Sequence, residues 1–175
     1  MVAGPLLRVQ GRSHQAAHYA LGNFPLAKLR AWFLIKRRLI KLKKRIQVTG
    51  AVFLQDNRVM AAQRGGGKAL DGYWEFPGGK IESGETPEEA LARELREELK
   101  VEAEVGEHLT TTEHEYDFGI VVLSTYFCTL HGEEPVLTEH KEVRWLTPDE
   151  LELLPWAPAD IPAVNLIKQR LTSKG

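Results

Sequence analysis

Residues 78–99 read GGKIESGETPEEALARELREEL, a glycine-rich run followed by the clearest helix of the chain. Thr86 stands at the expected N-cap, Pro87 fills the first helical position, and Glu89 completes a capping box. The pattern predicts a helix that ends at about Leu99. Its apolar positions form a stripe that would face a core, namely Ala90, Leu91, Leu95 and Leu99.

The polar face of this helix carries three glutamates. Glu94, Glu97 and Glu98 stand at i, i+3 and i+4 and therefore share one side of the helix, where their charges repel. Spacing alone leaves two interpretations open. One is a solvated face balanced by Arg93 and Arg96. The other is a divalent metal site, because Mg²⁺ and Mn²⁺ take carboxylate oxygens and keep waters and phosphates as further ligands; Arg93 would then orient the Glu97 carboxylate.

The glycines before the helix favour the metal site. Gly78-Gly79 allows a backbone carbonyl to turn towards the same metal, and Gly84 lets the loop fold back onto the helix. An earlier loop contains Gly65-Gly66-Gly67 and Asp71-Gly72, but no Gly-Lys-Ser/Thr follows it. Flexibility therefore explains that loop better than a phosphate cradle does.

Strand and turn signals lie on both sides of the helix. Strands are predicted at 46–54, 58–63, 101–105, 112–116, 120–130 and 143–146. Thr147 repeats the capping pattern before a short helix, and Asp160 would cap a last helix from Ile161 to about Leu171. Strands interleaved with helices, without internal repeats, predict an α/β domain with a mixed sheet.

Charge is distributed unevenly along the chain. The 175 residues hold 23 Lys+Arg and 24 Asp+Glu, but residues 1–55 contain 11 basic and no acidic side chains. We therefore expect residues 1–43 to form a basic N-terminal extension, either disordered or an amphipathic helix over residues 26–42, and residues 44–175 to form the folded domain. A basic segment of this kind also offers a non-enzyme alternative, a binder of nucleic acid or of a membrane surface.

Composition excludes several classes of site. Cys128 is the only cysteine, which excludes an intramolecular disulfide framework and a zinc site built from several thiolates. No stretch approaches the roughly 20 apolar residues that span a bilayer. No secretory signal is clear, although a transit peptide would share the basic, acid-poor composition of the first residues. We expect a cytoplasmic protein, monomeric or homodimeric, with no transmembrane segment and no specific nucleic-acid partner.

The spacing of the glycine run and the helix resembles a known family signature. Gly79 is followed after five residues by Glu85, and after seven more by Arg-Glu-Leu-Arg-Glu-Glu at residues 93–98, as in the Nudix hydrolases. Lys100 departs from the signature, since the family usually has glycine there. If a left-handed helix end is kept, a non-glycine residue costs roughly 1 kcal/mol. The resemblance implies the Nudix fold, a mixed β-sheet sandwiched between α-helices.

The resemblance also implies a ligand set and a reaction. It assigns magnesium, with manganese as an alternative, to the Gly79 carbonyl and to the carboxylates of Glu94, Glu97 and Glu98. The family chemistry is attack of water on a phosphorus of a nucleoside diphosphate linked to another group. Metal ions neutralise the phosphates and lower the pKa of a bound water. A glutamate must accept the proton, either Glu97 or one from a loop.

Two further stretches, Trp74–Glu82 and Ala157–Pro162, resemble the MutT branch of this family. That branch hydrolyses nucleoside triphosphates to the monophosphate and pyrophosphate and removes damaged ones. By this resemblance four residues would bind substrate, namely Arg64, Phe76, Lys80 and Asp160. One loop glutamate, Glu139, would coordinate the metal. Arg64 would contact phosphate through its guanidinium, and Phe76 would line the base pocket.

Asp160 bears on the choice of base. Members that read 8-oxoguanine have asparagine in its place, and an amide offers a donor and an acceptor, whereas an ionised aspartate offers acceptors only. An ionised Asp160 would favour an exocyclic amine such as N4 of cytosine. The run Ala-Pro-Ala-Asp-Ile-Pro also resembles CTP and modified-dCTP pyrophosphohydrolases.

We therefore expect a magnesium-dependent pyrophosphohydrolase that prefers cytidine triphosphates and sanitises the nucleotide pool. The alternative is an 8-oxo-dGTP diphosphatase that prevents DNA mutation. A Nudix-fold binding module without catalysis is a further alternative, and the intact Glu94, Glu97 and Glu98 argue against it.

Overall fold

Strand β1 (Arg45–Gln55) lies in the middle of the sheet and contains the strand predicted at 46–54. It pairs in parallel with β5 (Gly119–His131). At its end Asp56 and Asn57 take φ values of 50° and 58°, and the chain turns back into β2 (Arg58–Arg64). Two residues at positive φ are typical of a tight type I′ hairpin, which tolerates Asp and Asn.

The computed structural model describes residues 43–67, 69–132 and 135–173. These residues belong to one unit of the chain, Lys43–Gly175. The predicted basic extension over residues 1–43, with its amphipathic helix over 26–42, lies outside the described residues except for Lys43.

The sheet has six strands and is mixed. Its order is β3-β2-β1-β5-β4, with β6 paired to β2. The remaining bounds are β3 (Trp74–Glu75), β4 (Glu102–Tyr116) and β6 (His140–Leu146). The β1–β5 pair is parallel and the other pairs are antiparallel.

Strand β4 is one strand of 15 residues, whereas the sequence predicted two strands, at 101–105 and 112–116. The prediction was wrong because the polar stretch between them lacks strict alternation. The register with β5 shifts between Val105 and His108 and again between His108 and Thr110. Bulges therefore interrupt the alternation of side chains while the pairing continues.

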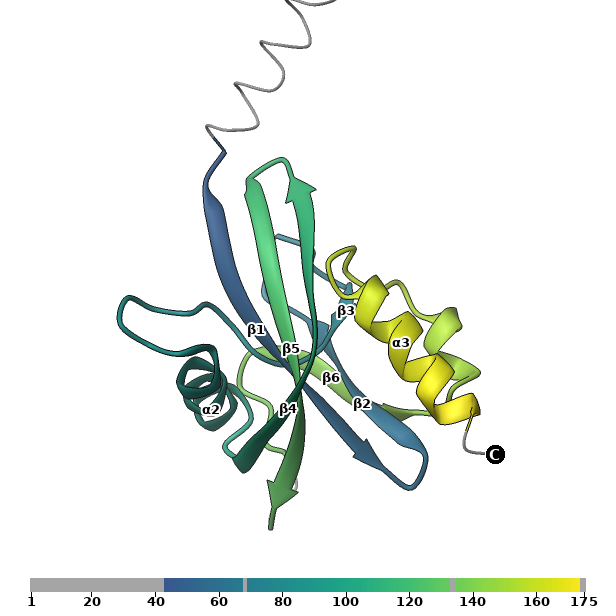
Figure 1. The fold of residues 1–175 in the computed structure, drawn as a ribbon. Helices are drawn as coiled ribbons and strands as arrows, with labels where there is room; N and C mark the ends of the chain where they lie inside the picture. Colours follow the sequence, from purple (N-terminus) through teal and green to yellow (C-terminus); the bar gives the residue numbers. More distant parts are fainter. Residues whose placement is uncertain (1–42, 68, 133–134, 174–175) are drawn as a thin grey trace, which may run out of the picture. The chain divides into compact units, whose positions relative to one another are not determined.

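Two helices cover opposite faces of the sheet (Figure 1). Side chains of a strand alternate between its faces. Ala51 and Phe53 accordingly pack with buried leucines of α2 (Pro87–Glu98), and Val52 packs with α3 (Ile161–Thr172). The predicted architecture, a mixed sheet sandwiched between helices, is confirmed. No helix in the described part of the chain is long and apolar enough to cross a bilayer.

Helix α2 has the start and the end that its sequence predicted. The Glu89 N–H donates to Thr86 Oγ1 at 3.2 Å, and the Thr86 N–H donates to Glu89 Oε2 at 2.8 Å, which completes the capping box. After Leu99, Lys100 takes a φ of 57°. The left-handed helix end is therefore kept with lysine in the place of the usual glycine.

The last helical segments begin differently from the prediction. The short helix after Thr147 is a 3₁₀ turn, Glu150–Leu153. Asp160 precedes α3 but makes no capping hydrogen bond. Its Oδ1 instead accepts the Phe76 N–H at 3.0 Å, so Asp160 stands at the predicted N-cap position but its side chain does not cap the helix. The Asp160 carboxyl group is therefore hydrogen-bonded to the backbone just after β3 and not to the first turn of α3.

The left-handed Lys100 gives the first prediction. Lys100→Gly should raise the free energy of unfolding by about 0.5–1 kcal/mol, because relief of the left-handed conformation outweighs the larger entropy of glycine in the unfolded chain. Lys100→Ala keeps Cβ and should give no such gain. Urea unfolding of the three proteins measures the difference. Equal stabilisation by alanine would show that the lysine side chain, and not its backbone conformation, is responsible.

Candidate active site

Arg93 of α2 binds the loop that precedes the helix. Its Nε donates to Glu85 Oε1 at 2.7 Å, and its Nη2 donates to Glu85 Oε2 at 2.9 Å and to the Lys80 carbonyl at 3.0 Å. The hydrogen bonds from Arg93 are the main reason that the pKa of Glu85 falls to about 2. Arg93 thus fixes residues 80–85 against the helix face that carries the glutamates.

Gly78 and Gly79 allow this loop to pass close to β1 and to α2. A Cβ on Gly78 would collide with the Thr49 carbonyl oxygen, and a Cβ on Gly79 would lie 2.5 Å from both carboxylate oxygens of Glu94. The Gly79 carbonyl accepts the Thr49 N–H at 2.8 Å, which leaves one lone pair for another ligand. The glycines are required here because backbone and carboxylate approach so closely.

The three glutamates of α2 differ in exposure and in partners. Arg93 Nη1 lies 2.9 Å from a carboxylate oxygen of Glu94 and 3.4 Å from one of Glu97, whose side chain is 61% exposed. The Glu98 side chain is 17% exposed, and its Oε2 is buried without a hydrogen-bond partner among the residues that the structure describes. Arg93 therefore holds Glu94 more closely than Glu97, the carboxylate that it was predicted to orient.

The Glu98 carboxyl group lies in an acidic and partly dehydrated setting. Burial, followed by the charges of Glu94, Glu139 and Glu75, raises its pKa to about 7, and His140 opposes this effect. The side chain of His140 is almost fully buried, with Nε2 3.3 Å from Glu75 Oε1 and 4.0 Å from Glu98 Oε2. A cation beside Glu98 would offset much of this repulsion.

Neither Glu75 nor His140 was singled out from the sequence. Glu75 stands inside the Trp74–Glu82 run, and His140 follows the loop residue Glu139. Their proximity to those positions was the only sign in the sequence that they belong to the site. The contact between the two side chains could not be predicted, because it joins β3 to β6.

The donors on this helix face suit a hard divalent cation. No three His, Cys, Asp or Glu side chains of the described residues converge closely enough to enclose a metal ion. Glu98 Oε2, which lacks a hydrogen-bond partner among the described residues, and the Glu94 carboxylate against Gly79 nevertheless present oxygen donors on one side of α2. Mg²⁺ binds few protein oxygens and completes its shell with water and phosphate. The residues therefore fit a metal ion whose ligands come partly from the protein and partly from the substrate.

A pocket of about 560 Å³ opens beside these carboxylates. It brings together most of the residues that the sequence assigned to metal or substrate: Arg64, Lys80, Glu94, Glu98, Glu139 and Asp160. Four others, Phe76, Gly79, Arg93 and Glu97, are not among the residues that line it. Arg93 and Gly79 lie behind the lining and shape it through Glu94.

Arg64 enters the pocket at the end of β2, where the resemblance predicted a phosphate contact. Its Nη1 forms an ion pair with Glu75 Oε2, and its Nε donates to the Ala69 carbonyl at 3.1 Å. The guanidinium is thus held by β3 and by the loop after β2. A fixed guanidinium suits bidentate recognition of a phosphate.

Phe76 is not among the residues that line the pocket, and the contact of its ring with the base stays a prediction. The side chain is 3% exposed and belongs to the core, where its centroid lies 5.1 Å from that of Trp156. Residues from β1, β2 and α3 complete this cluster, and they could not be seen next to Phe76 in the sequence. The contribution of Phe76 to the pocket is its N–H, which holds Asp160.

Asp160 lines the pocket but differs from the ionised acceptor that the sequence argument assumed. Burial above all, and then the charge of Glu75, raises the pKa of Asp160 well above its ordinary value, while the Phe76 N–H and Arg64 partly oppose this. Burial therefore shifts the ionisation of Asp160 towards the neutral carboxyl group. A protonated carboxyl group has one O–H donor as well as acceptors, so it resembles an amide in what it offers a base.

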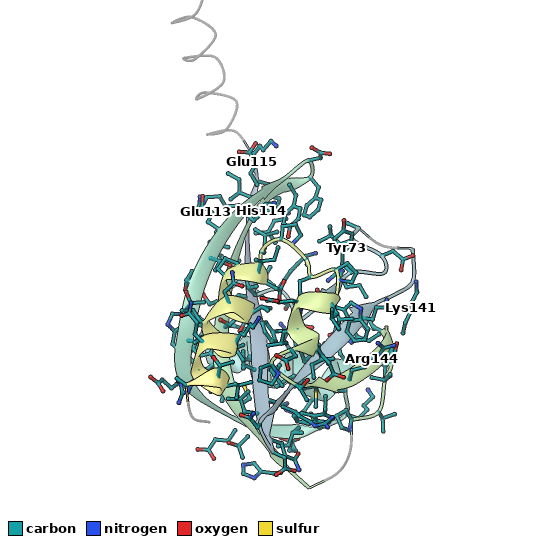
Figure 2. The ribbon with its side chains drawn as sticks, turned by 90° about the vertical axis from the view of Figure 1, so that its right-hand side faces the viewer. Tyr73, Glu113, His114, Glu115, Lys141 and Arg144 are labelled. Atoms are coloured by element: carbon teal, nitrogen blue, oxygen red, sulfur yellow. The ribbon has the colours of Figure 1, made fainter. Side chains whose placement is uncertain are left out.

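The hairpin between β4 and β5 supplies an aromatic wall that the sequence analysis missed. Tyr116 and Phe118 both line the pocket, and their rings stack with centroids 5.0 Å apart. The Tyr116 hydroxyl accepts the Ala159 N–H at 3.0 Å, next to Asp160. Figure 2 shows this end of the molecule, with His114 on the hairpin and Tyr73 on the loop before β3.

The sequence and the fold together define the class of protein. Residues 43–167 match the model of the NUDIX domain, so the chain belongs to the Nudix family of hydrolases. The family, the fold and the enzyme class predicted from the signature are confirmed. Members of this family generally use a divalent metal.

Individual relatives lie in the MutT-like part of the family. The chain is 40% identical over 123 residues to the CTP pyrophosphohydrolase of Escherichia coli K12, covering 70% of this chain and 90% of that protein. It is 38% identical over 122 residues to the putative 8-oxo-dGTP diphosphatase 2 of Mycobacterium tuberculosis H37Rv, covering 66% and 82%. A MutT structure from methicillin-resistant Staphylococcus aureus 252 is similar with a TM-score of 0.62 and 56% identity, covering 74% and 99%.

The raised pKa of Glu98 predicts a pH dependence of stability. In metal-free protein the stabilising contribution of neutral Glu98 is complete below pH 4.5 and is lost as the pH rises through about 7. Between pH 5 and 8 the wild type should therefore lose about 2–3 kcal/mol more unfolding free energy than Glu98→Gln. Asp160 contributes with the same sign in both proteins, so the comparison isolates Glu98.

Glu97→Gln is the matched control, because its side chain is exposed, and it should follow the wild type. Urea unfolding with EDTA at the two pH values measures the difference. A wild type and a Glu98→Gln variant with the same pH dependence would refute the buried acidic setting of Glu98.

Proposed function

We propose that this protein hydrolyses nucleoside triphosphates to the monophosphate and pyrophosphate with magnesium, or alternatively manganese, as cofactor. The observation that carries the proposal is the pocket itself. Its wall holds the Glu98 carboxyl group, whose buried Oε2 lacks a hydrogen-bond partner in the described part of the chain, together with the cations Arg64 and Lys80 and the buried carboxyl group of Asp160. Carboxylates for a metal, cations for phosphates and a hydrogen-bonding group for a base are the parts that such a substrate requires.

The metal ligands are assigned to oxygen atoms around α2. We assign the Gly79 carbonyl and the side chains of Glu94, Glu97, Glu98 and Glu139 to this role. The bound metal supplies charge neutralisation of the phosphates and a lower pKa for the attacking water. Arg93 acts as a positioning residue, since its contacts join the helix to the loop that carries Gly79.

Substrate contacts follow from the pocket lining. Arg64 and Lys80 bind phosphate oxygens and position the triphosphate for in-line attack by water. Two glutamates are candidates for accepting the proton of the attacking water, and Glu139 is the better placed. Glu139 lines the pocket with Glu98, whereas the Glu97 side chain lies outside the lining and is 61% exposed.

We further propose that Asp160 reads the base as a neutral carboxyl group. The O–H and C=O of a carboxylic acid complement N3 and N4–H of cytosine, and they also complement the O6 and N1–H pair of guanine. The choice of cytidine triphosphates as preferred substrates is therefore supported mainly by the relative named CTP pyrophosphohydrolase. Hydrolysis of 8-oxo-dGTP, named for another relative, is the second candidate.

The biological setting follows from the reaction. An enzyme that removes modified cytidine or 8-oxoguanine triphosphates would sanitise the nucleotide pool, in the cytoplasm and without a specific nucleic-acid partner. Residues 44–175 would form the catalytic domain and residues 1–43 an extension. We expect the enzyme to be a monomer or a homodimer.

A substrate panel tests the function. With Mg²⁺, the enzyme should release pyrophosphate from dCTP and 5-methyl-dCTP with a higher kcat/KM than from 8-oxo-dGTP, and EDTA should abolish the release. Asp160→Asn should retain cytidine activity within about tenfold, because an amide also offers a donor and an acceptor. Asp160→Leu should lose about 100-fold or more, because neither group remains.

The outcomes separate the reaction from the base preference. A large advantage for 8-oxo-dGTP would contradict the cytidine preference and leave the reaction class intact. Failure to release pyrophosphate from any nucleoside triphosphate would contradict the reaction class.

A further inference from the structure

Residues 135–139 lie against the C-terminal end of α2, although they are distant in sequence. The Val136 N–H donates to the Leu99 carbonyl at 2.8 Å, and the Thr138 N–H donates to the Glu98 carbonyl at 3.1 Å. The Thr138 hydroxyl lies 2.8 Å from the Glu98 carbonyl and 3.2 Å from the Glu97 carbonyl. Thr138 thus reaches the backbone of two of the predicted metal ligands.

These contacts satisfy a need of the helix. The last carbonyls of an α-helix have no partner within the helix and usually bond to water or to a cap. Here Lys100 turns the chain away in a left-handed conformation, and the segment before β6 supplies the donors.

The same contacts hold the segment, because burial contributes little to it. The side chains of Val136 and Leu137 are large and apolar but remain 57% and 38% exposed. Hydrogen bonds to α2 therefore position this stretch. The bonds of Thr138 are made by the residue immediately before Glu139.

Glu139 follows Thr138 and lines the pocket together with Glu98. Its charge acts on the Glu98 carboxyl group, and the next residue, His140, brings Nε2 to 4.0 Å from Glu98 Oε2. Thr138 thus donates a hydrogen bond to the Glu98 carbonyl, and the next two residues, Glu139 and His140, lie near the Glu98 carboxyl group.

We propose that Thr138 is a positioning residue, whose hydroxyl fixes Glu139 beside the carboxylates of α2. The inference rests on the proposed function, because it needs Glu139 to serve the metal or the attacking water. It goes further by giving the Thr138 hydroxyl a part in placing that glutamate, beside the backbone hydrogen bonds of Val136 and Thr138 to α2.

The experiment compares Thr138→Val with Thr138→Ser in the full chain. Valine keeps the shape and removes the donor, so kcat for dCTP should fall about tenfold while KM changes little. Serine keeps the hydroxyl and should restore kcat to near the wild-type value. Thr172→Val is the matched control, since the Thr172 hydroxyl makes the same type of bond to the Lys168 and Gln169 carbonyls at the end of α3. It should leave kcat unchanged.

Two further readouts distinguish positioning from a general structural effect. In a Glu139→Gln background, Thr138→Val should change kcat by less than about twofold, because Thr138 would act through Glu139. Titration with Mn²⁺ followed by electron paramagnetic resonance should show weaker binding by Thr138→Val than by Thr138→Ser.

Equal kcat for Thr138→Val and the wild type would overturn the inference, and so would a loss of equal size in both backgrounds or a loss that serine does not restore. An inactive wild type would instead refute the proposed function. The Mn²⁺ titration would then still decide the inference, because unchanged affinity in Thr138→Val would overturn it.

Discussion

The site depends on one arginine fork, the paired contact between Arg93 and Glu85. Without a positive group at its centre, the loop and helix would bring several carboxylates together at a cost in repulsion. The guanidinium bonds both oxygens of Glu85, the Lys80 carbonyl and Glu94. It thereby sets the distance between the loop backbone at Gly79 and the Glu94 carboxylate, which is too short for any side chain on that glycine.

A short strand, β3, links the two ends of the pocket. The Phe76 N–H, just after β3, holds Asp160, while the Glu75 carboxylate pairs with Arg64 and lies 3.3 Å from His140, which borders Glu98. The charge of Glu75 also helps to raise the pKa of both Asp160 and Glu98. The base-reading carboxyl group and the carboxylates of α2 therefore share an electrostatic environment, so a change at β3 should affect both.

Local signals in the sequence were sufficient for α2 and its capping box, because these depend on neighbours within a few residues. Contacts between distant segments decided what the sequence could not predict. Pairing with β5 joined two predicted strands into β4. The Phe76 ring packs in the core and does not line the pocket. The Phe76 N–H donates to the Asp160 carboxyl group, 84 residues away in sequence, and this carboxyl group therefore does not cap α3. Burial also raises the pKa of Asp160, so the sequence argument, which assumed an ionised aspartate, had to be changed.

The central claim, that the Arg93 fork holds the carboxylates of α2 in place for a metal, is tested most directly by calorimetric titration with Mn²⁺. Arg93→Lys keeps the charge but not the fork, and Arg96→Lys is a matched control on the exposed side of the same helix. The account predicts that Arg93→Lys binds Mn²⁺ about 10–100-fold more weakly than the wild type, while Arg96→Lys binds it equally well. Equal Mn²⁺ affinity in Arg93→Lys and the wild type would contradict the account.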